Sequence, residues 1–280
     1  MPSRHLTLGH SPDPDDAFMF YALAQGRIDT RGWRFEHVLQ DIQILNERAL
    51  NAELDITAIS IHAYPCVVHN YALLNCGASV GDGYGPLIVA PRPMSVDDLR
   101  GRTLAVPGES TTAFLVTSLL LGAGGFKYDV VAFDKILEHV AAGKADAGLI
   151  IHEGQLTYQR QRLHKIVDLG EWWKQTTGLP LPLGGNCIRR ALGQDAIREI
   201  AAILKGSVEY ALAHRDEALQ YALRYARDMG KPVADKFVAM YVNHWTLDYG
   251  ELGRQAVHEL LRRGHDIGLV PQVGQIDFVG

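Results

Sequence analysis

Four polar segments each follow an apolar run that is typical of a buried strand. Ser11 opens SPDPDD after HLTLGH, Ser60 ends DITAIS, the segment 108–112 (GESTT) comes after RTLAV, and His152 directly follows AGLII. In open α/β sheets, ligands bind beyond the carboxyl ends of the strands. We therefore expect these hydroxyls and this imidazole to line a common ligand site.

The segment GESTT begins a predicted helix, and two interpretations of it stay open. The free N–H groups of a helix start, the helix dipole and the hydroxyls of Thr111 and Thr112 together suit a carboxylate or a phosphate. Serine and threonine are also common as plain N-caps. The segment is not a P-loop, because it lacks the GK[ST] ending.

His152 is the candidate general base. An imidazole titrates near neutral pH, at about 6.5 when unperturbed, and its place after a strand directs it to the edge of the sheet. The alternative is a half-buried structural histidine, since the chain has 12 histidines.

The segment SPDPDD has three carboxylates within four positions, at Asp13, Asp15 and Asp16. A cation site is one interpretation, but the two prolines and the absence of EF-hand spacing favour capping of the next helix by Asp15 or Asp16. Ser11 is the member of this segment that we expect nearest to a ligand.

Metal and nucleophile motifs are missing from the sequence. Cys66, Cys76 and Cys187 have no CxxC spacing, and neither HExxH nor GxSxG occurs. We expect no metal and no disulfide framework, which suits a reducing compartment.

Composition restricts the classes of partner. The 280 residues carry 27 basic and 32 acidic side chains, a net charge of −5, which argues against a nucleic-acid partner. The N-terminus does not resemble a secretory signal, and no apolar run of about 18 residues predicts a membrane helix. We expect a cytoplasmic protein, monomer or homodimer, that takes a small carboxylate substrate.

Strand-like and helix-like segments alternate up to about residue 190, and helices follow from Asp195 onward. This order predicts an α/β fold with mixed, mostly parallel sheets and helices on both faces. Proline-rich breaks at 90–96 and 179–186 predict two lobes with a cleft between them. The first comprises residues 1–92 and 187–280 with the C-terminal helices, and residues 93–186 form an inserted smaller lobe.

Six motifs in this order resemble the 1,4-dihydroxy-6-naphthoate synthases, late enzymes of the futalosine route to menaquinone. The matching segments are SPDPDDAFMFYAL (11–23), DITAISIHAY (55–64), GYGPLIVA (83–90), VPGESTTAFL (106–115), DAGLIIHEGQLTY (146–158) and DLGEWW with TGLPLPLGGN (168–186). One departure is Asp15, where many members carry asparagine, so the contact of this residue with ligand stays open.

The resemblance implies a two-lobed fold like that of periplasmic binding proteins (type II) and a lyase without metal or organic cofactor. The implied reaction cleaves cyclic dehypoxanthinyl futalosine to 1,4-dihydroxy-6-naphthoate and dihydroxyacetone. By motif, His152 becomes the proton acceptor. The implied substrate contacts are Ala58, Ile59, Ser60, Thr112 and Ala113, with Thr111 and Ser11 as neighbours.

Three alternatives remain at this point. A non-catalytic solute-binding protein would share the fold, but the missing signal argues against it. The sister chorismate dehydratase also shares the fold, whereas IIHEGQLTY and SPDPDD favour the naphthoate synthase. A transcriptional regulator would need a basic helix-turn-helix segment, which we do not find.

Overall fold

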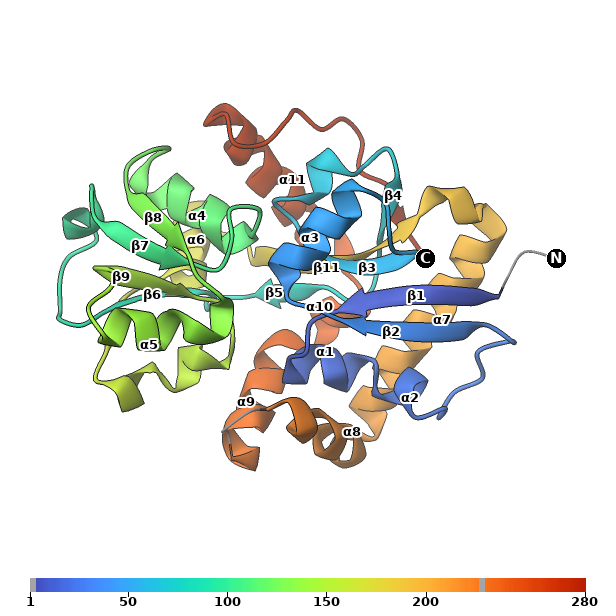
Figure 1. Cartoon of the computed structure of the whole chain (residues 1–280). Helices are drawn as coiled ribbons and strands as arrows, with labels where there is room; N and C mark the ends of the chain where they lie inside the picture. The colour runs from blue at the N-terminus through green and yellow to red at the C-terminus, as the bar shows by residue number, and fades with distance from the viewer. Residues whose placement is uncertain (1–3, 227–229) are drawn as a thin grey trace. The chain divides into compact units, whose positions relative to one another are not determined.

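Two mixed β-sheets, each covered by helices, organise the chain in the computed structural model, which describes residues 4–226 and 230–280 (Figure 1). One compact unit comprises Met1–Val80, Gly184–Glu251 and Val273–Gly280, and the other comprises Gly81–Leu183 and Leu252–Gln272. The α/β fold class is confirmed. The expected domain boundaries, 1–92 with 187–280 and 93–186, stay a prediction.

The sheet of the first unit has the order β12-β4-β11-β3-β1-β2, with β5 beside β11. Its strands are β1 (His5–His10), β2 (Arg34–Leu39), β3 (Ile56–Ser60), β4 (Tyr71–Leu74), β5 (Ser79–Gly81), β11 (Leu181–Arg189) and β12 (Phe278–Val279). β1 is parallel to both β2 and β3, whereas β11 is antiparallel to β3 and β4. The parallel trio therefore directs three carboxyl ends to one edge.

Helices from both ends of the sequence cover the first sheet. They are α1 (Pro14–Met19), α2 (Tyr21–Ala24), α3 (Ile42–Leu50), α7 (Gln194–Ala213), α8 (Arg215–Ala222), α9 (Lys231–Tyr241) and α10 (His244–Leu247). Apolar residues of β1, α1, α7 and α8 share one buried core. Polar contacts add to it: Ser207 donates to the Met19 carbonyl at 2.8 Å, and the Trp33 indole donates to Glu199 at 2.9 Å.

The sheet of the second unit has the order β10-β6-β9-β7-β8. Its strands are β6 (Leu87–Ala90), β7 (Thr103–Val106), β8 (Lys127–Val130), β9 (Ala147–Ile150) and β10 (His164–Asp168). β7 is parallel to β8 and β9, and β6 is antiparallel to β9 and β10. The carboxyl ends of β7, β8 and β9 thus meet at one edge of this sheet.

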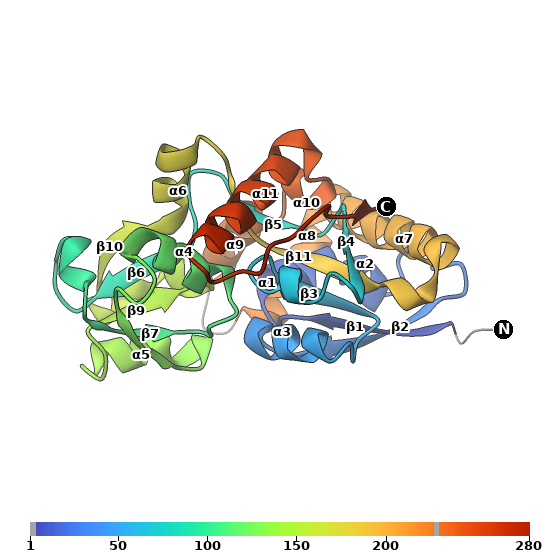
Figure 2. The same ribbon diagram turned by 90° about the horizontal axis from the view of Figure 1, so that it is seen from above.

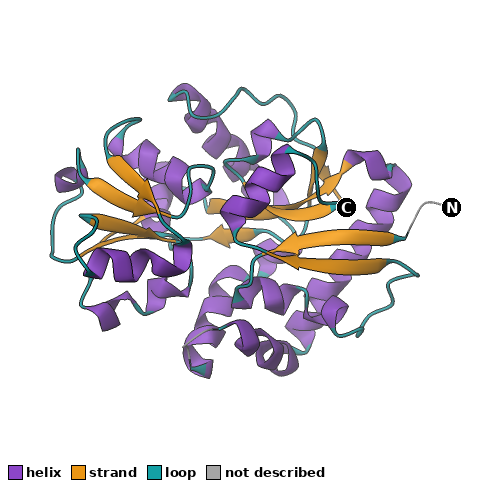
Figure 3. Cartoon of the chain, in the orientation of Figure 1, coloured by secondary structure: helices purple, strands orange, loops and turns teal. Residues whose placement is uncertain are grey.

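Helices lie on both faces of the second sheet (Figure 3). They are α4 (Thr112–Leu121), α5 (Ile136–Ala141) and α6 (Leu169–Thr177). A further helix, α11 (Gly250–Asp266), belongs to this unit from Leu252 onward. α5 packs its Ile136, Leu137 and Val140 side chains against this sheet. α11 lies beside α4 and α6, although it comes from the end of the sequence (Figure 2).

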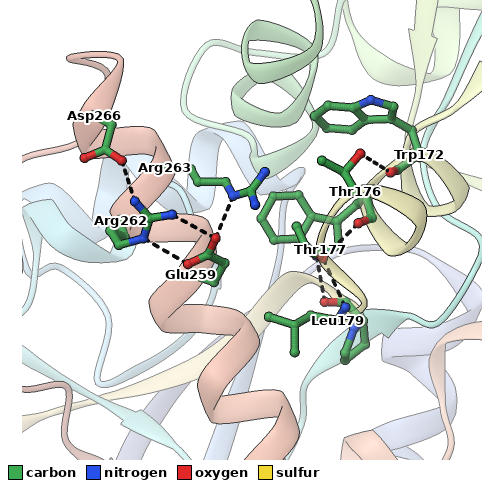
Figure 4. Close-up of polar contacts among 10 residues, drawn as sticks. Trp172, Thr176, Thr177, Leu179, Glu259, Arg262, Arg263 and Asp266 are labelled. Atoms are coloured by element: carbon green, nitrogen blue, oxygen red, sulfur yellow. Dashed lines mark hydrogen bonds and ion pairs between the residues drawn. The ribbon is translucent and has the colours of Figure 1, made fainter.

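The polar face of α11 is ordered around Glu259 (Figure 4). Glu259 accepts hydrogen bonds from Arg262 and Arg263, and these contacts, the Arg262 hydrogen bond first, lower the pKa of Glu259 to about 2. The Arg263 guanidinium lies 5.4 Å from the ring centroid of Trp173 on α6. This contact attaches α11 to the second unit through a cation–π interaction.

Short 3-10 helices complete the described structure. They are η1 (Tyr64–Cys66), η2 (Asp97–Leu99), η3 (Phe133–Lys135), η4 (Glu153–Leu156), η5 (Tyr158–Gln161), η6 (Arg190–Leu192) and η7 (Leu223–Tyr225). No helix of the part that the structure describes is both long enough and apolar enough to cross a membrane.

Most elements expected from the sequence are confirmed, and two expectations are wrong. The single helix expected after SPDPDD is divided at Phe20 into α1 and α2. The proline-rich segment 179–186, expected as a break between the lobes, instead enters the strand β11. Its partners β3 and β4 lie more than 100 residues earlier, so no local pattern indicates the pairing.

The motifs GYGP and DLGEWW meet through their backbones. A Cβ on Gly170 would lie 1.9 Å from the Tyr84 carbonyl oxygen, and a Cβ on Gly85 would lie 2.9 Å from the Gly170 nitrogen. The Leu169 N–H donates to the Pro86 carbonyl at 2.9 Å. Only glycine allows this approach of α6 to the segment before β6, so both motifs have a structural role.

We predict that Gly170→Ala destabilises the fold by about 2 kcal/mol or more, because its Cβ meets backbone that cannot move aside. Gly206→Ala is the matched control: it lies in α7, and a Cβ there meets nothing within 4 Å. Better helix propensity makes that variant more stable by roughly 0.5–1 kcal/mol. Urea denaturation measures both, and equal stability of the two variants would contradict the prediction.

Candidate functional site

Two of the predicted site residues follow neighbouring parallel strands of the first sheet. Gly9 of β1 pairs with Thr57 of β3, so Ser11 and Ser60 come at the same carboxyl edge. Ser60 is buried and Ser11 is partly buried. The structure thus brings these two hydroxyl-bearing residues to one edge, as expected.

Ser60 is held by Asn46, a residue that the sequence analysis did not single out. The Ser60 N–H donates to Asn46 Oδ1 at 2.9 Å, and Asn46 Nδ2 donates to Ser60 Oγ at 3.0 Å. Both side chains are almost completely buried, at 1% and 3% exposed. Because its oxygen accepts from Asn46, the Ser60 hydroxyl keeps its own proton for another acceptor.

Ala58 and Ile59 are buried within β3, with Ile59 fully covered. The Ala58 side chain packs with Leu45 and Leu54. Their neighbour β11 places Gly184 and Gly185 opposite Ser60 and Ile59. Glycine is required at 185, because a Cβ there would lie 2.3 Å from the Tyr249 hydroxyl.

The turn SPDPDD is organised by its own carboxylates. The Ser11 hydroxyl donates to Asp13 Oδ2, and the Ser11 N–H donates to Asp16 Oδ2, both at 2.6 Å. The expected cap is wrong: α1 starts at Pro14 with Asp13 in the N-cap position, and Asp15 and Asp16 lie in the first turn. Proline at the first helical position explains the start, since its φ is already helical.

Crowding of these carboxyl groups changes their protonation. Burial raises the pKa of Asp16 to about 7, with a further rise from Asp13 and an opposing effect of the Ser11 N–H. The pKa of Asp15 is also raised, by burial first and then by Asp16 and Asp13. The turn next to Ser11 therefore carries less negative charge near neutrality than its sequence suggests.

A histidine pair lies beside this turn and was also missed from the sequence. His10 Nδ1 is 3.1 Å from the Ser11 carbonyl oxygen, and His10 Nε2 is 2.9 Å from His37 Nδ1. Burial, followed by the neighbouring His37, lowers the pKa of His10 to about 4. Both ring nitrogens of His10 are thus occupied, and its ring is neutral at physiological pH.

His152 follows β9 at the carboxyl edge of the second sheet, and its side chain is 6% exposed. Its ring meets Phe133 edge-on, with centroids 5.4 Å apart. Phe133 follows β8 and His152 follows β9, so their loops meet across the end of β7. A Cβ on Gly154 would lie 2.9 Å from His152 Cε1, so this glycine leaves room for the imidazole.

The start of α4 lies after β7, at the same edge. Thr111 is the N-cap: its Oγ1 accepts from the Phe114 N–H at 3.3 Å and donates to the Gly108 carbonyl at 2.8 Å. Thr112 donates its hydroxyl to the Leu183 carbonyl at 2.5 Å. The cap interpretation is therefore confirmed. Thr112 and Ala113 are the first two residues of this helix.

The predicted residues thus gather in two sets, Ser11 with residues 58–60 on the first sheet and His152 with residues 111–113 on the second. Within residues 4–226 and 230–280, no group of three or more His, Cys, Asp or Glu residues could hold a metal ion.

Comparison with known proteins gives the family. A family model described as menaquinone biosynthesis matches residues 6–266. The chain belongs to this family. It is 45% identical over 264 residues to a protein of Thermus thermophilus, and 41% identical over 273 residues to one of Streptomyces coelicolor, both named 1,4-dihydroxy-6-naphtoate synthase. These matches cover 94% and 96% of this chain and 95% and 96% of the relatives.

Solved structures support the fold. A crystal structure of an Archaeoglobus fulgidus protein matches with a TM-score of 0.92 at 42% identity, covering 96% of this chain and 100% of that one. The alkanesulfonate-binding protein of Xanthomonas axonopodis matches with a TM-score of 0.72 at 12% identity, and the match covers 97% of this chain and 96% of that one. A Candida albicans protein described with the generic periplasmic binding protein fold matches with a TM-score of 0.74 at 14% identity, and the match covers 99% of this chain and 93% of that one. The expected fold and the resemblance are confirmed, and the protein is an enzyme of menaquinone biosynthesis.

We predict that Asn46→Ala destabilises the protein by about 1–3 kcal/mol, because it removes both bonds to Ser60 and leaves a buried N–H without its acceptor. The control is Asn51→Ala at the exposed end of the same helix, with an expected change within about 0.5 kcal/mol. Thermal and urea denaturation measure the difference. A loss no larger than that of the control would show that the Asn46 contacts contribute nothing.

The turn beside Ser11 gives a pH prediction. The pKa of Asp16 is higher in the fold than in the unfolded chain, so its contribution to stability is present below about pH 4 and is lost as the pH rises toward about 7. Asp16→Asn has no such group, so its stability relative to wild type should rise by about 1 kcal/mol or more from pH 4 to 7. Asp195→Asn, whose side chain is 96% exposed, should show no such trend.

Stability curves in urea at pH 4, 5, 6 and 7 measure this difference. A constant gap between Asp16→Asn and wild type would mean that Asp16 titrates as it does in the unfolded chain.

Proposed function

We propose that this protein is a 1,4-dihydroxy-6-naphthoate synthase, a carbon–carbon lyase that converts cyclic dehypoxanthinyl futalosine to 1,4-dihydroxy-6-naphthoate and dihydroxyacetone. The observation that supports this most is the identity of 45% with a relative of that name over 94% of the chain. His152 follows β9 at the carboxyl edge of the second sheet, and the chain belongs to the menaquinone-biosynthesis family. Both observations are consistent with the proposal.

We assign the general base to His152. Cleavage of the retro-aldol type starts when a base removes a hydroxyl proton of the substrate. The O–H electron pair forms a carbonyl, the adjacent carbon–carbon bond breaks, and its electrons pass into the ring that becomes aromatic. Aromatisation supplies the thermodynamic drive. A positioned base typically contributes about 10²–10⁴-fold to the rate.

The ring of His152 is held in one place for this role. Phe133 lies edge-on to it, and Gly154 leaves space beside Cε1. Packing that restricts rotation of the imidazole keeps this base oriented toward the substrate proton that it removes.

The other assigned residues bind rather than transfer protons. The N–H groups of Thr112 and Ala113 at the start of α4, with the helix dipole, favour a carboxylate or a developing negative charge. In the proposal, the Ser60 hydroxyl donates to the substrate while Asn46 holds its oxygen. Ala58 and Ile59, with buried side chains, contribute through their backbone, and Thr111 and Ser11 keep the adjacent turns in place.

The test is His152→Asn, which keeps a polar side chain of similar reach but removes the titratable nitrogen. We predict that turnover falls by about 10²–10⁴-fold, because proton removal then depends on water. Binding of substrate should change by less than about tenfold. Product formation is followed by mass spectrometry, and binding by calorimetry with the variant.

His164→Asn is the matched control, because His164 is an exposed histidine of the same unit, on β10. Wild-type turnover by His152→Asn would refute the base assignment. Conversion of chorismate by loss of water would identify a chorismate dehydratase instead. Binding of the futalosine derivative without any product would favour a solute-binding protein.

A further inference from the structure

The strand β8 forms one end of the five-stranded sheet, where it pairs with β7. Its four residues, Lys127–Val130, are all exposed. Two of them are large and apolar: the exposed fractions of Tyr128 and Val130 are 39% and 56%. An edge strand with exposed apolar side chains is suited to pairing with a further strand.

The backbone groups of β8 alternate between β7 and the open edge. The Lys127 N–H donates to the Arg102 carbonyl at 2.8 Å, and the Val131 N–H donates to the Val106 carbonyl at 2.9 Å. The backbone N–H and C=O groups of residues 127, 129 and 131 therefore face β7. Because the direction alternates along a strand, the N–H and C=O groups of Tyr128 and Val130 face the open edge.

The order of charges along β8 is self-complementary. In an antiparallel pair of two β8 strands centred on Tyr128, each Lys127 stands opposite Asp129 of the other copy. Opposite charges in such cross-strand positions are stabilising, and like charges are destabilising. Centring the pair on Asp129 would place two carboxylates opposite each other, and centring it on Val130 would leave both charges opposite apolar residues.

The same register suits the backbone and the apolar face. The two Tyr128 residues, whose N–H and C=O groups face outward, would exchange both hydrogen bonds across a twofold axis. Val130 would stand opposite Phe126 of the other copy. Tyr128 already packs against Phe114 and Phe126, at centroid distances of 5.0 and 6.1 Å, so pairing would extend an existing aromatic cluster.

We propose that the protein forms a homodimer through antiparallel pairing of β8 with β8 of a second copy. Two five-stranded sheets would then become one continuous sheet of ten strands. Four residues per copy cover less area than the roughly 1,200 Å² of a stable interface, so the dimer is weak, with a Kd of about 10–100 µM.

The test is sedimentation of the full chain at about 1 to 200 µM, a range that spans this Kd. Wild type should change from monomer to dimer within it. Asp129→Lys places lysine opposite lysine twice and should raise the Kd at least about tenfold, and Lys127→Asp should do the same with carboxylates. Glu138→Lys, an exposed change of the same charge on α5, should leave the Kd unchanged.

A mixture of the two single variants provides the most specific test of the proposed register. Asp129→Lys carries lysine at 127 and 129, and Lys127→Asp carries aspartate at both, so the mixed dimer pairs opposite charges twice. The mixture should dimerise where neither variant does alone. Thermal melting of each variant shows that it is folded.

Hydrogen exchange by mass spectrometry locates the contact. Amide protection in the segment 126–131 should rise with protein concentration in wild type and not in Asp129→Lys. A monomer at all concentrations, or a dimer that Asp129→Lys leaves unchanged, would overturn the proposal. A dimer without added protection in this segment would overturn it as well.

Discussion

Parallel pairing of β1 with β3 and of β7 with β9 is the constraint on which the candidate site depends. Parallel strands end at one edge, so the residues that follow them are neighbours although they are far apart in sequence. Ser11 and Ser60 are brought together in this way, and so are His152 and the start of α4. The side chains at these edges are then fixed locally, by Asn46 for Ser60 and by Phe133 for His152. Strand direction selects the residues, and packing fixes their orientation.

Much of the fold could be predicted because it depends on local patterns. The alternating run at 5–10, the amphipathic helix at 42–50 and the apolar strand at 147–150 occur where periodicity indicates them. β11 could not be predicted in this way, because its two glycines and its proline are typical of a turn. They are acceptable in a strand here because Tyr249 fills the space beside Gly185, and that residue lies 64 positions later.

The candidate site was predictable at the strand ends but not in its supporting contacts. Asn46 carried a usable signal: it lies four residues after Ile42 and three before Ala49, on the apolar side of α3, where a polar side chain must find a buried partner. The predicted N-cap of α1 was wrong because three aspartates are candidates for that position. Pro14 rather than a carboxylate sets the start of the helix. The close contact of His10 with His37 joins two strands, and neither strand's sequence alone indicates it.

The fold does not decide between an enzyme and a binding protein, since an alkanesulfonate-binding protein shares it at 12% identity. Hydroxyls and helix N–H groups suffice to bind an anion, but cleavage of a carbon–carbon bond also needs a group that accepts a proton near neutral pH. His10 is unsuited, because its ring nitrogens meet the Ser11 carbonyl and His37, and its pKa is lowered to about 4. His152 lies at the strand edge of the second unit, where its ring is buried and packs edge-on against Phe133. The relatives named as synthases, rather than the fold, therefore favour an enzyme over a binding protein.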